Sequence, residues 1–467
     1  MNFLNIIEKK LSLGKKNEIA KLLKTDVKSL EAFEKSYAKS ILSQGPSDNF
    51  FEINAKQAAE MVPTVAIDNQ EVEMLIDRIV NELLAQTTIY EFDGETLKTI
   101  EEKKLTSNRI VSQEDINKLP PPLQPQLTGE LMKVDMPGPS YELVLWYYSE
   151  YRKHMGTEKG KMAYNHFRQG LDILDLDPIL YQVIGMNQNS IGHWFPALVR
   201  AIGRQEFFKV PKTTYIEVPI TLLQLTRVEW GELTPTTLAI VDRFCQKAFH
   251  LDESQEYFVK TGTFSSKYDY RNAYVHGPKE VRELGEYLLF IHHQALQMAA
   301  PTATPTIVGA STTNEWVVRE FIPDKENNPC IYKGLPLHTE YRIFVDFDSL
   351  KVIGMSPYWE PETMKRRFSC EADANTPHQV HDYIIFAAHE ETLMKRYQEN
   401  AQKVKNHIEA MLPDMDLHGQ WSIDVMQNGN DFWVIDMALA QNSALLNCVP
   451  KELRKPTEER WMPQLEK

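Results

Sequence analysis

Residues 420–439, QWSIDVMQNGNDFWVIDMAL, decide the fold of the C-terminal half of this chain. Two apolar runs flank the pair Asn428-Gly429, and an Asn-Gly pair between such runs predicts a β-hairpin. Side chains alternate along a strand. The first strand is therefore expected to place on one face Ser422, Asp424 and Met426. The second strand is expected to place on one face Phe432, Val434, Asp436 and Ala438.

Each run of this hairpin contains an aspartate. If the strands pair about Asn430, then Asp424 and Asp436 lie directly opposite each other, with their Cβ atoms about 5 Å apart. Two carboxylates at this distance repel each other unless a cation lies between them, and Mg²⁺ prefers such oxygen ligands. We therefore predict a magnesium site here. The alternative is that both acids cap strand ends or pair with a lysine.

Strands and helices alternate through residues 211–450, which we predict to form one α+β domain. Strands are expected in TTYIEVP (213–219), EYFVKTGTF (256–264), EWVVREFIP (315–323) and EYRIFVDFDSLKVIGMSPYW (340–359). Helices are expected at 234–249, 280–300 and 397–412, where apolar residues recur at helical spacing.

The rest of the chain is divided by composition. Residues 1–118 are predicted to be mostly helical, with one β-hairpin around Asp93-Gly94. Residues 119–139 are rich in proline and read as a linker. Residues 140–210 are predicted to form a small α/β domain that includes a buried strand, ILYQVIGM (179–186), and residues 451–467 to form a C-terminal tail.

Several basic side chains are candidates for binding phosphate. Lys260 ends an apolar strand and precedes a loop of small residues, whose N–H groups and hydroxyls suit an anion, and Lys267 can complete that cradle. Arg342 either contacts phosphate or pairs with an acid. Arg367, with Arg366 in an expected loop, is either near a transferring phosphoryl group or part of a solvated basic patch.

The order of these parts resembles the ATP-grasp superfamily. The resemblance runs through the Lys260 strand and its loop, REFIP (319–323), EYRIFV (340–345), and the IDV and VIDM runs of the closing hairpin. It is closest to a divergent branch that includes the assembly chaperone of eukaryotic translation initiation factor 2 and related phage and bacterial proteins. The implied fold has two α/β subdomains that grip ATP, after a small pre-grasp domain (140–210) and the helical N-terminal region.

The resemblance also implies roles for residues. Lys260 would bind the α- and β-phosphates, with help from Lys212 in VPKT, and Asp424 and Asp436 would hold Mg²⁺. The nucleotide would lie beside four residues of the hinge strand: Arg319, Glu320, Phe321 and Ile322. The family usually ends its last strand with acid-x-Asn, whereas this chain has Asp436-Met437-Ala438. Asn442 is the candidate to replace that asparagine as a metal ligand.

The implied reaction is ATP-dependent ligation of a small-molecule or peptide carboxylate to an amine through an acyl-phosphate, with Lys260, Arg342 and Arg367 as catalytic residues. The alternatives are a Mg-ATP-binding scaffold or assembly chaperone, whose protein partner would bind the N-terminal helical region, and a kinase for a small molecule or peptide. Either would use the same nucleotide site.

Composition limits the partners. The formal net charge of −14 disfavours nucleic acid and anionic membranes. No apolar run is long enough to span a membrane. The four cysteines are far apart in sequence, which argues against a zinc site or a disulfide framework. These features indicate a cytoplasmic protein.

Overall fold

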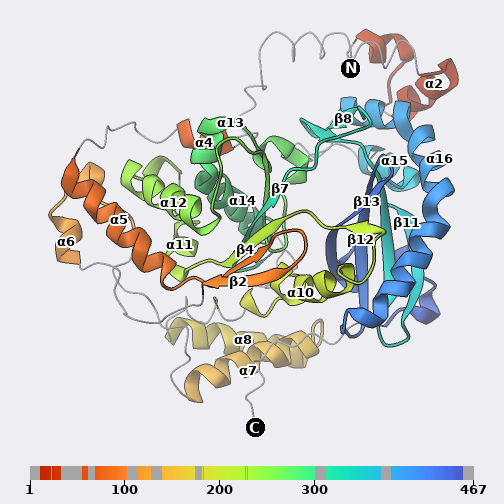
Figure 1. Cartoon of the computed structure of the whole chain (residues 1–467). Coiled ribbons are helices and arrows are strands. Elements are labelled where there is room, and N and C mark those ends of the chain that lie inside the picture. The colour runs from red at the N-terminus through yellow and green to blue at the C-terminus, as the bar shows by residue number, and fades with distance from the viewer. Residues whose placement is uncertain are drawn as a thin grey trace.

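The computed structural model describes residues 11–22, 24–32, 55–60, 69–101, 113–127, 139–173, 181, 184–226, 228, 230–299, 312–369 and 380–455. Within these residues the protein has an α+β architecture built on two main β-sheets (Figure 1). We call them sheet A, which has six strands, and sheet B, which has five.

Sheet A has the strand order β2-β1-β4-β7-β5-β6, and every neighbouring pair is antiparallel. Its strands are β1 Ile89–Phe92, β2 Leu97–Glu101, β4 Thr213–Glu217, β5 Tyr257–Thr261, β6 Tyr274–Val275 and β7 Glu315–Glu320. The hairpin expected around Asp93-Gly94 is therefore confirmed, and it forms the edge of this sheet next to β4.

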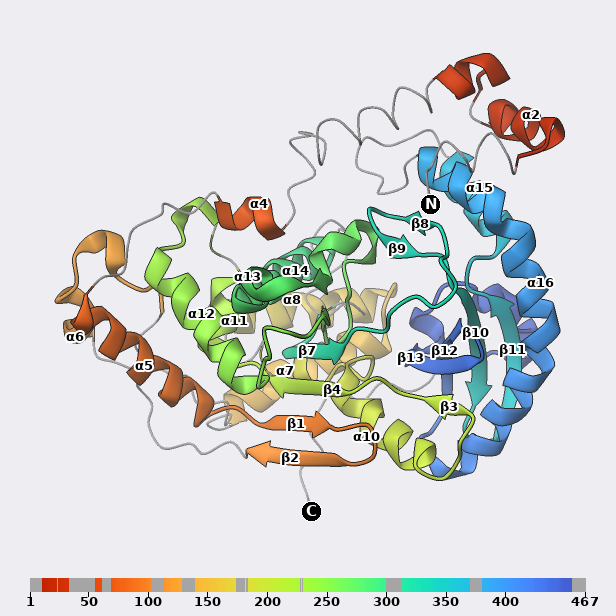
Figure 2. The ribbon, with the colours of Figure 1, turned by 45° about the horizontal axis from the view of Figure 1, so that its top comes forward.

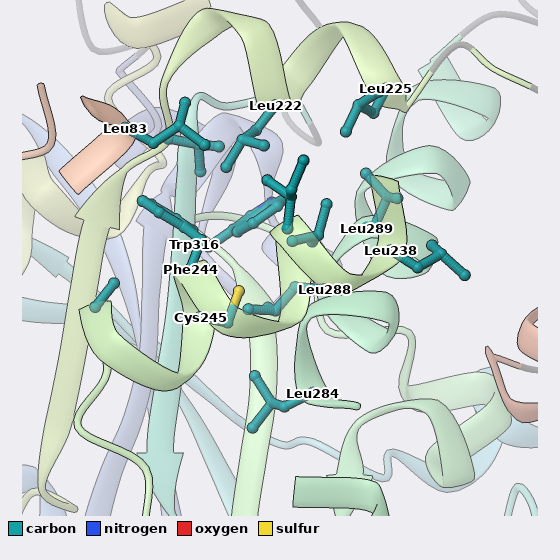
Figure 3. Packing of buried hydrophobic residues seen from close by; sticks show 14 of the residues in the cluster. Leu83, Leu222, Leu225, Leu238, Phe244, Cys245, Leu284, Leu288, Leu289 and Trp316 are labelled. Carbon is teal, nitrogen blue, oxygen red and sulfur yellow. The ribbon is translucent and has the colours of Figure 1, made fainter. Parts of the chain in front are cut away.

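Helices cover one face of sheet A. They are α4 Ala55–Glu60, α5 Gln70–Leu84, α11 Ile220–Leu225, α12 Pro235–Ala248, α13 Gly277–Arg282 and α14 Leu284–Ala299. Thr234 caps α12, because its side chain accepts a hydrogen bond from the Thr237 N–H. Leu83, Phe244 and Leu288 of three helices meet Trp316 of β7 in one core (Figure 3). The N-terminal region thus shares a core with the C-terminal half.

Sheet B has the order β11-β10-β12-β13-β3. Its strands are β3 Phe208–Lys209, β10 Thr339–Asp346, β11 Lys351–Pro357, β12 Gln420–Asn428 and β13 Asp431–Leu439. Helix α16, Val380–Met411, lies along its outer side (Figure 1). Helix α10, Ile191–Ile202, contributes Trp194 and Phe195 to a second core that joins the two sheets.

The closing hairpin has the expected register at its acids. Its loop is Gly429-Asn430, and Val425 pairs with Val434. A β-bulge follows, in which Ile435 has no partner, so that Asp424 pairs with Asp436. The prediction that these two aspartates lie opposite each other is confirmed.

The bulge also changes which side chains share a face. Phe432 and Val434 are buried in the same core as Met437 and Leu439, whereas Asp436 lies on the opposite face. The expectation that Asp436 shares a face with Phe432 and Val434 is therefore wrong, because the extra residue shifts the alternation by one position.

The region 140–210 differs from its prediction. It contains α7 Pro139–Lys153, α8 Glu158–Ile173 and α10, and the described residues of the expected strand ILYQVIGM are helical or in loops. Among the described residues of this region, the single strand is the short β3. The expected small α/β domain is thus mainly helical in its described part.

The remaining elements are short or peripheral. Helix α2 Leu13–Leu22 packs beside helix α16 and helix α15 Pro361–Ser369. Helix α6 spans Gln113–Asn117. A separate hairpin, formed by β8 Cys330–Ile331 and β9 Leu335–Pro336, belongs to neither sheet (Figure 2). The 3₁₀ helices are η1 Pro121–Leu123, η2 Trp230–Glu232, η3 Lys267–Asn272, η5 Leu412–Asp414, η6 Ala440–Asn442, η7 Leu446–Cys448 and η8 Lys451–Leu453. None of the described helices is both long and apolar enough to cross a membrane.

Candidate functional site

A pocket lies between sheets A and B. With its open mouth included, its volume is about 990 Å³, at the upper end of the range for small-molecule sites. Eight of the residues predicted from the sequence line it: Lys260, Lys267, Arg319, Glu320, Phe321, Ile322, Asp424 and Asp436. The fold therefore brings together side chains that are far apart in sequence.

Lys260 crosses the pocket from sheet A to sheet B. It is on β5, its side chain is 2% exposed, and its Nζ is 3.1 Å from Oδ1 of Asp436 on β13. Burial lowers the pKa of Lys260, and the Asp436 carboxylate opposes that effect. The lysine is thus held beside the acid that was predicted to bind metal.

Asp424 is paired with Arg342. Arg342 donates from Nε and from a terminal nitrogen to the two carboxylate oxygens of Asp424, at 2.9 and 2.6 Å. Of the two roles open to Arg342, the structure shows pairing with an acid. The carboxylate on the second strand is less fully bonded, since Oδ2 of Asp436 has no hydrogen-bond partner among the described residues.

The loop after Lys260 is a smaller phosphate cradle than its sequence indicates. The amides of Thr261, Gly262, Thr263 and Phe264 all donate to oxygen atoms within the protein. A Cβ at Gly262 would lie 2.1 Å from Oγ of Ser190, so this position requires glycine. Within the described chain, the next three amides, of Ser265, Ser266 and Lys267, have no acceptor and remain available to a ligand.

Lys267 and Glu340 occupy the same part of the pocket. Lys267 Nζ lies 4.5 Å from the centre of the Tyr358 ring and forms no ion pair with a described residue. The Arg342 guanidinium lies over the same ring, 4.6 Å from its centre. Burial raises the pKa of Glu340 to about 7, and the positive charge of Lys267 is the largest opposing influence.

Arg319 is buried on β7, at 5% exposure, and reaches across to sheet B. It donates to the carbonyl oxygen of Ile435, the bulged residue of β13. Its Nε has no partner, and no described carboxylate is within ion-pair distance. Burial lowers the pKa of Arg319 to about 10.

The hinge residues span the end of β7 and the two residues that follow it. The Phe321 ring lies 4.3 Å from the Tyr274 ring, centre to centre, at a tilt of 36°, and the Phe321 N–H donates to the carbonyl oxygen of Glu256. The Ile322 N–H has no acceptor among the described residues and is available at the pocket wall. Glu320 is exposed at the rim, 3.9 Å from Lys212.

Four predicted site residues lie outside the pocket lining: Arg342, which is paired with Asp424, and Lys212, Arg367 and Asn442. Lys212 is 63% exposed and contacts Glu320 at the rim. Arg367 lies in helix α15, not in the expected loop. Asn442 is exposed in η6 and accepts a hydrogen bond from Asn189 at 3.2 Å. Lys212 is thus at the rim, beside Glu320, whereas neither Arg367 nor Asn442 lines the pocket.

Asp424 and Asp436 fit a magnesium ion in part. A carboxylate has about four lone-pair positions, and Arg342 uses two of those on Asp424, so both acids retain some capacity to bind a cation. No group of three or more His, Cys, Asp or Glu side chains in the described chain is arranged to hold a metal. The remaining ligands would have to be phosphate oxygens and water, as is usual for Mg²⁺.

Sequence reasoning missed part of the pocket wall. Glu340, Tyr358 and Trp359 line it from β10 and the end of β11, and Met426 and Ile435 line it from the hairpin. Glu340 had a usable signal, because it lies on the same face of its strand as Arg342. Met426 had one too, because it shares a face of its strand with Asp424.

The comparisons with known proteins are sparse. No protein-family model and no curated protein matches the chain. Among solved structures, six chains match, including Cdc123 and C-terminally truncated Cdc123, both from Schizosaccharomyces pombe. Each shows 15% identity and a TM-score of 0.34 over 59% of this chain and 96% of that chain. A likeness at this level assigns no function to the chain. Any functional assignment has to come from the geometry of the site.

Proposed function

We propose that this chain binds Mg-ATP between its two sheets, in the manner of an ATP-grasp protein. Arg319 is the observation that carries the proposal. A buried guanidinium with an unpartnered nitrogen and no ion pair to a described carboxylate is costly, and the nearby Asp436 charge offsets only part of that cost. Phosphate oxygens would supply both the missing charge and the missing acceptors.

The two ends of the pocket suit the two ends of a nucleotide. Phe321 and Ile322 line the pocket just beyond the end of β7, where the Ile322 N–H can donate to a purine base. Lys260 pairs with Val317, further back along β7, and would face the triphosphate together with Lys267. Asp424 and Asp436 would hold Mg²⁺, an ion that neutralises phosphate charge when bound.

The reaction that we expect from this site is ligation. A substrate carboxylate oxygen attacks the γ-phosphorus and ADP leaves, after which an amine attacks the acyl-phosphate carbon and releases phosphate. Lys260 and Lys267 would stabilise charge on the transferring group. No side chain needs to act as a covalent nucleophile.

A specific observation favours a second candidate, a scaffold that binds Mg-ATP without turnover. Ala438 stands where the family pattern has asparagine, and the possible replacement, Asn442, is engaged by Asn189 outside the pocket. This leaves the metal with fewer protein ligands than a catalytic site of this type usually has. Measuring ADP formation with mixed carboxylate and amine substrates separates the two candidates, because only a ligase releases ADP in response to both.

The central experiment compares two substitutions on one strand. Asp436→Asn should weaken Mg-ATP binding about 10- to 100-fold, because it removes a charged ligand, as measured by calorimetric titration. Asp431→Asn is the matched control: Asp431 is also on β13 but pairs with Lys209 and Lys325 away from the pocket. Equal Mg-ATP affinity in the two variants would contradict the proposal.

A further inference from the structure

The segment Asn187–Gly192, NQNSIG, is bonded to both halves of the pocket. On the sheet A side, the Asn187 side chain donates to the Thr312 carbonyl at 2.6 Å, and the Ile191 N–H donates to the Gly262 carbonyl at 3.1 Å. Gly262 is two residues after Lys260. This side of the segment therefore holds the loop that follows the lysine.

The same segment reaches sheet B through Asn189. Its Oδ1 accepts a hydrogen bond from the Leu439 N–H at 2.9 Å, three residues after Asp436. Its Nδ2 donates to Oδ1 of Asn187 at 2.9 Å and to Oδ1 of Asn442 at 3.2 Å. Asn189 thus connects the end of β13 to the segment that holds the Lys260 loop.

Glu315, the first residue of β7, holds the segment in place by accepting hydrogen bonds from it. The Gly192 N–H donates to Oε2 of Glu315 at 3.0 Å, and the Ser190 hydroxyl donates to the same oxygen. The Gly262 N–H in turn donates to the Glu315 carbonyl at 2.9 Å. The Ser190 and Glu315 side chains are buried, so the segment has little freedom to shift relative to β7 and the Lys260 loop.

An asparagine is the side chain that suits position 189. It must accept from one N–H and donate to two oxygens, and a primary amide offers both functions in one plane. An aspartate would keep the acceptor for Leu439 but would face the oxygens of Asn187 and Asn442 without a proton to donate. An alanine would lose all three bonds.

We propose that Asn189 is a positioning residue for the nucleotide site, which fixes the strand that carries Asp436 against the loop that follows Lys260. This inference rests on the proposed function. Its consequence is selective: loss of Asn189 should disturb the phosphate and metal end of the pocket, where the two strands meet. Phe321 and Ile322, which would hold the base, form no hydrogen bond with this segment among the described residues, so their side of the pocket should keep its shape.

The test uses the full chain and two probes, Mg-ATP and adenosine, with the affinity of each measured by calorimetry or by competition. Asn189→Asp should lower the affinity for Mg-ATP about five- to tenfold, the effect of a lost hydrogen bond, and change the affinity for adenosine less than about twofold. Gln188→Glu makes the same amide-to-acid change one residue away, at a side chain with no hydrogen bond to a described residue, and should leave both affinities unchanged.

The outcomes separate this inference from the proposed function. If the wild-type chain binds neither probe, the proposed function is wrong. If it binds both, and Asn189→Asp behaves like Gln188→Glu or loses both affinities equally, the positioning role is wrong. Asn189→Ala, which adds no charge, is measured in the same way should the aspartate variant fail to fold.

Discussion

At the scale of single residues, the two arginines of the site are expected to contribute differently to the free energy of unfolding. Arg342 is paired in bidentate fashion with buried Asp424, whereas Arg319 is buried without a carboxylate partner. Arg319→Met should therefore leave the free energy of unfolding unchanged or raise it by about 1 kcal/mol in the absence of nucleotide. It should also weaken Mg-ATP binding about tenfold or more. Urea denaturation and calorimetry measure the two effects.

Arg342→Met is the contrasting control for this prediction. It leaves the Asp424 carboxylate buried and unpaired, which should cost about 3–5 kcal/mol of stability. A similar loss of stability in the Arg319→Met variant would show that Arg319 contributes to the fold and not to ligand binding.

Glu340 predicts a pH dependence. Burial raises its pKa to about 7 in the folded chain, well above the value of about 4.3 in an unfolded chain. A raised carboxyl pKa contributes stability that is fully present below the unfolded value and is lost as pH rises through the folded value. The apo protein should lose roughly 3 kcal/mol from this group between about pH 4.5 and 8.

The measurement is the free energy of unfolding from pH 5 to 9 for the wild type and for Glu340→Gln. The charged groups that influence the pKa of Glu340 are Lys267, Asp424 and Arg342. They are present in both proteins, as are the other buried acids, so the difference between the two curves isolates Glu340. A difference that is constant across this pH range would show that Glu340 ionises normally.

At the scale of elements, the sequence pattern predicted the two strands of the closing hairpin and their facing aspartates but not the bulge. Apolar residues alternate at Phe432 and Val434 and then resume at Met437 and Leu439. This change of phase was a readable sign of an inserted residue. A strict period of two could not represent it, because the rule assumes one partner for each residue.

The loop after Lys260 shows a different limit. Its small residues were read as amide donors for phosphate, but four of its amides are satisfied inside the protein. Their acceptors include the carbonyl of Glu315, more than fifty residues away in the chain. Within 179–186 the described residues are helical or in a turn and not in the expected strand, since a short apolar run fits a buried helix as well as a strand.

At the scale of the whole molecule, the pocket exists because two sheets face each other. Lys260 and Arg319 come from sheet A, and their partners Asp436 and Ile435 come from sheet B. Pattern predicted the order of the strands along the chain. It could not place Lys212, Arg367 and Asn442, because their distance from the pocket depends on how the two sheets meet and on where helix α15 and η6 lie.

The position of the pocket between two sheets predicts where a bound nucleotide should slow amide hydrogen exchange. A nucleotide held by both sheets should slow amide hydrogen exchange in β5 and β7 and also in β12 and β13. At a ligand concentration 100 times the dissociation constant, binding adds about 2.7 kcal/mol to stability, or roughly a 100-fold slowing for amides that exchange when the sheets separate or unfold.

Helices α7 and α8 pack chiefly against each other and serve as an internal control. Local opening of that pair should be unaffected by Mg-ATP, and the Asp436→Asn variant should show little slowing anywhere. Protection confined to one sheet would mean that the ligand binds a single subdomain, contrary to a site that both sheets build.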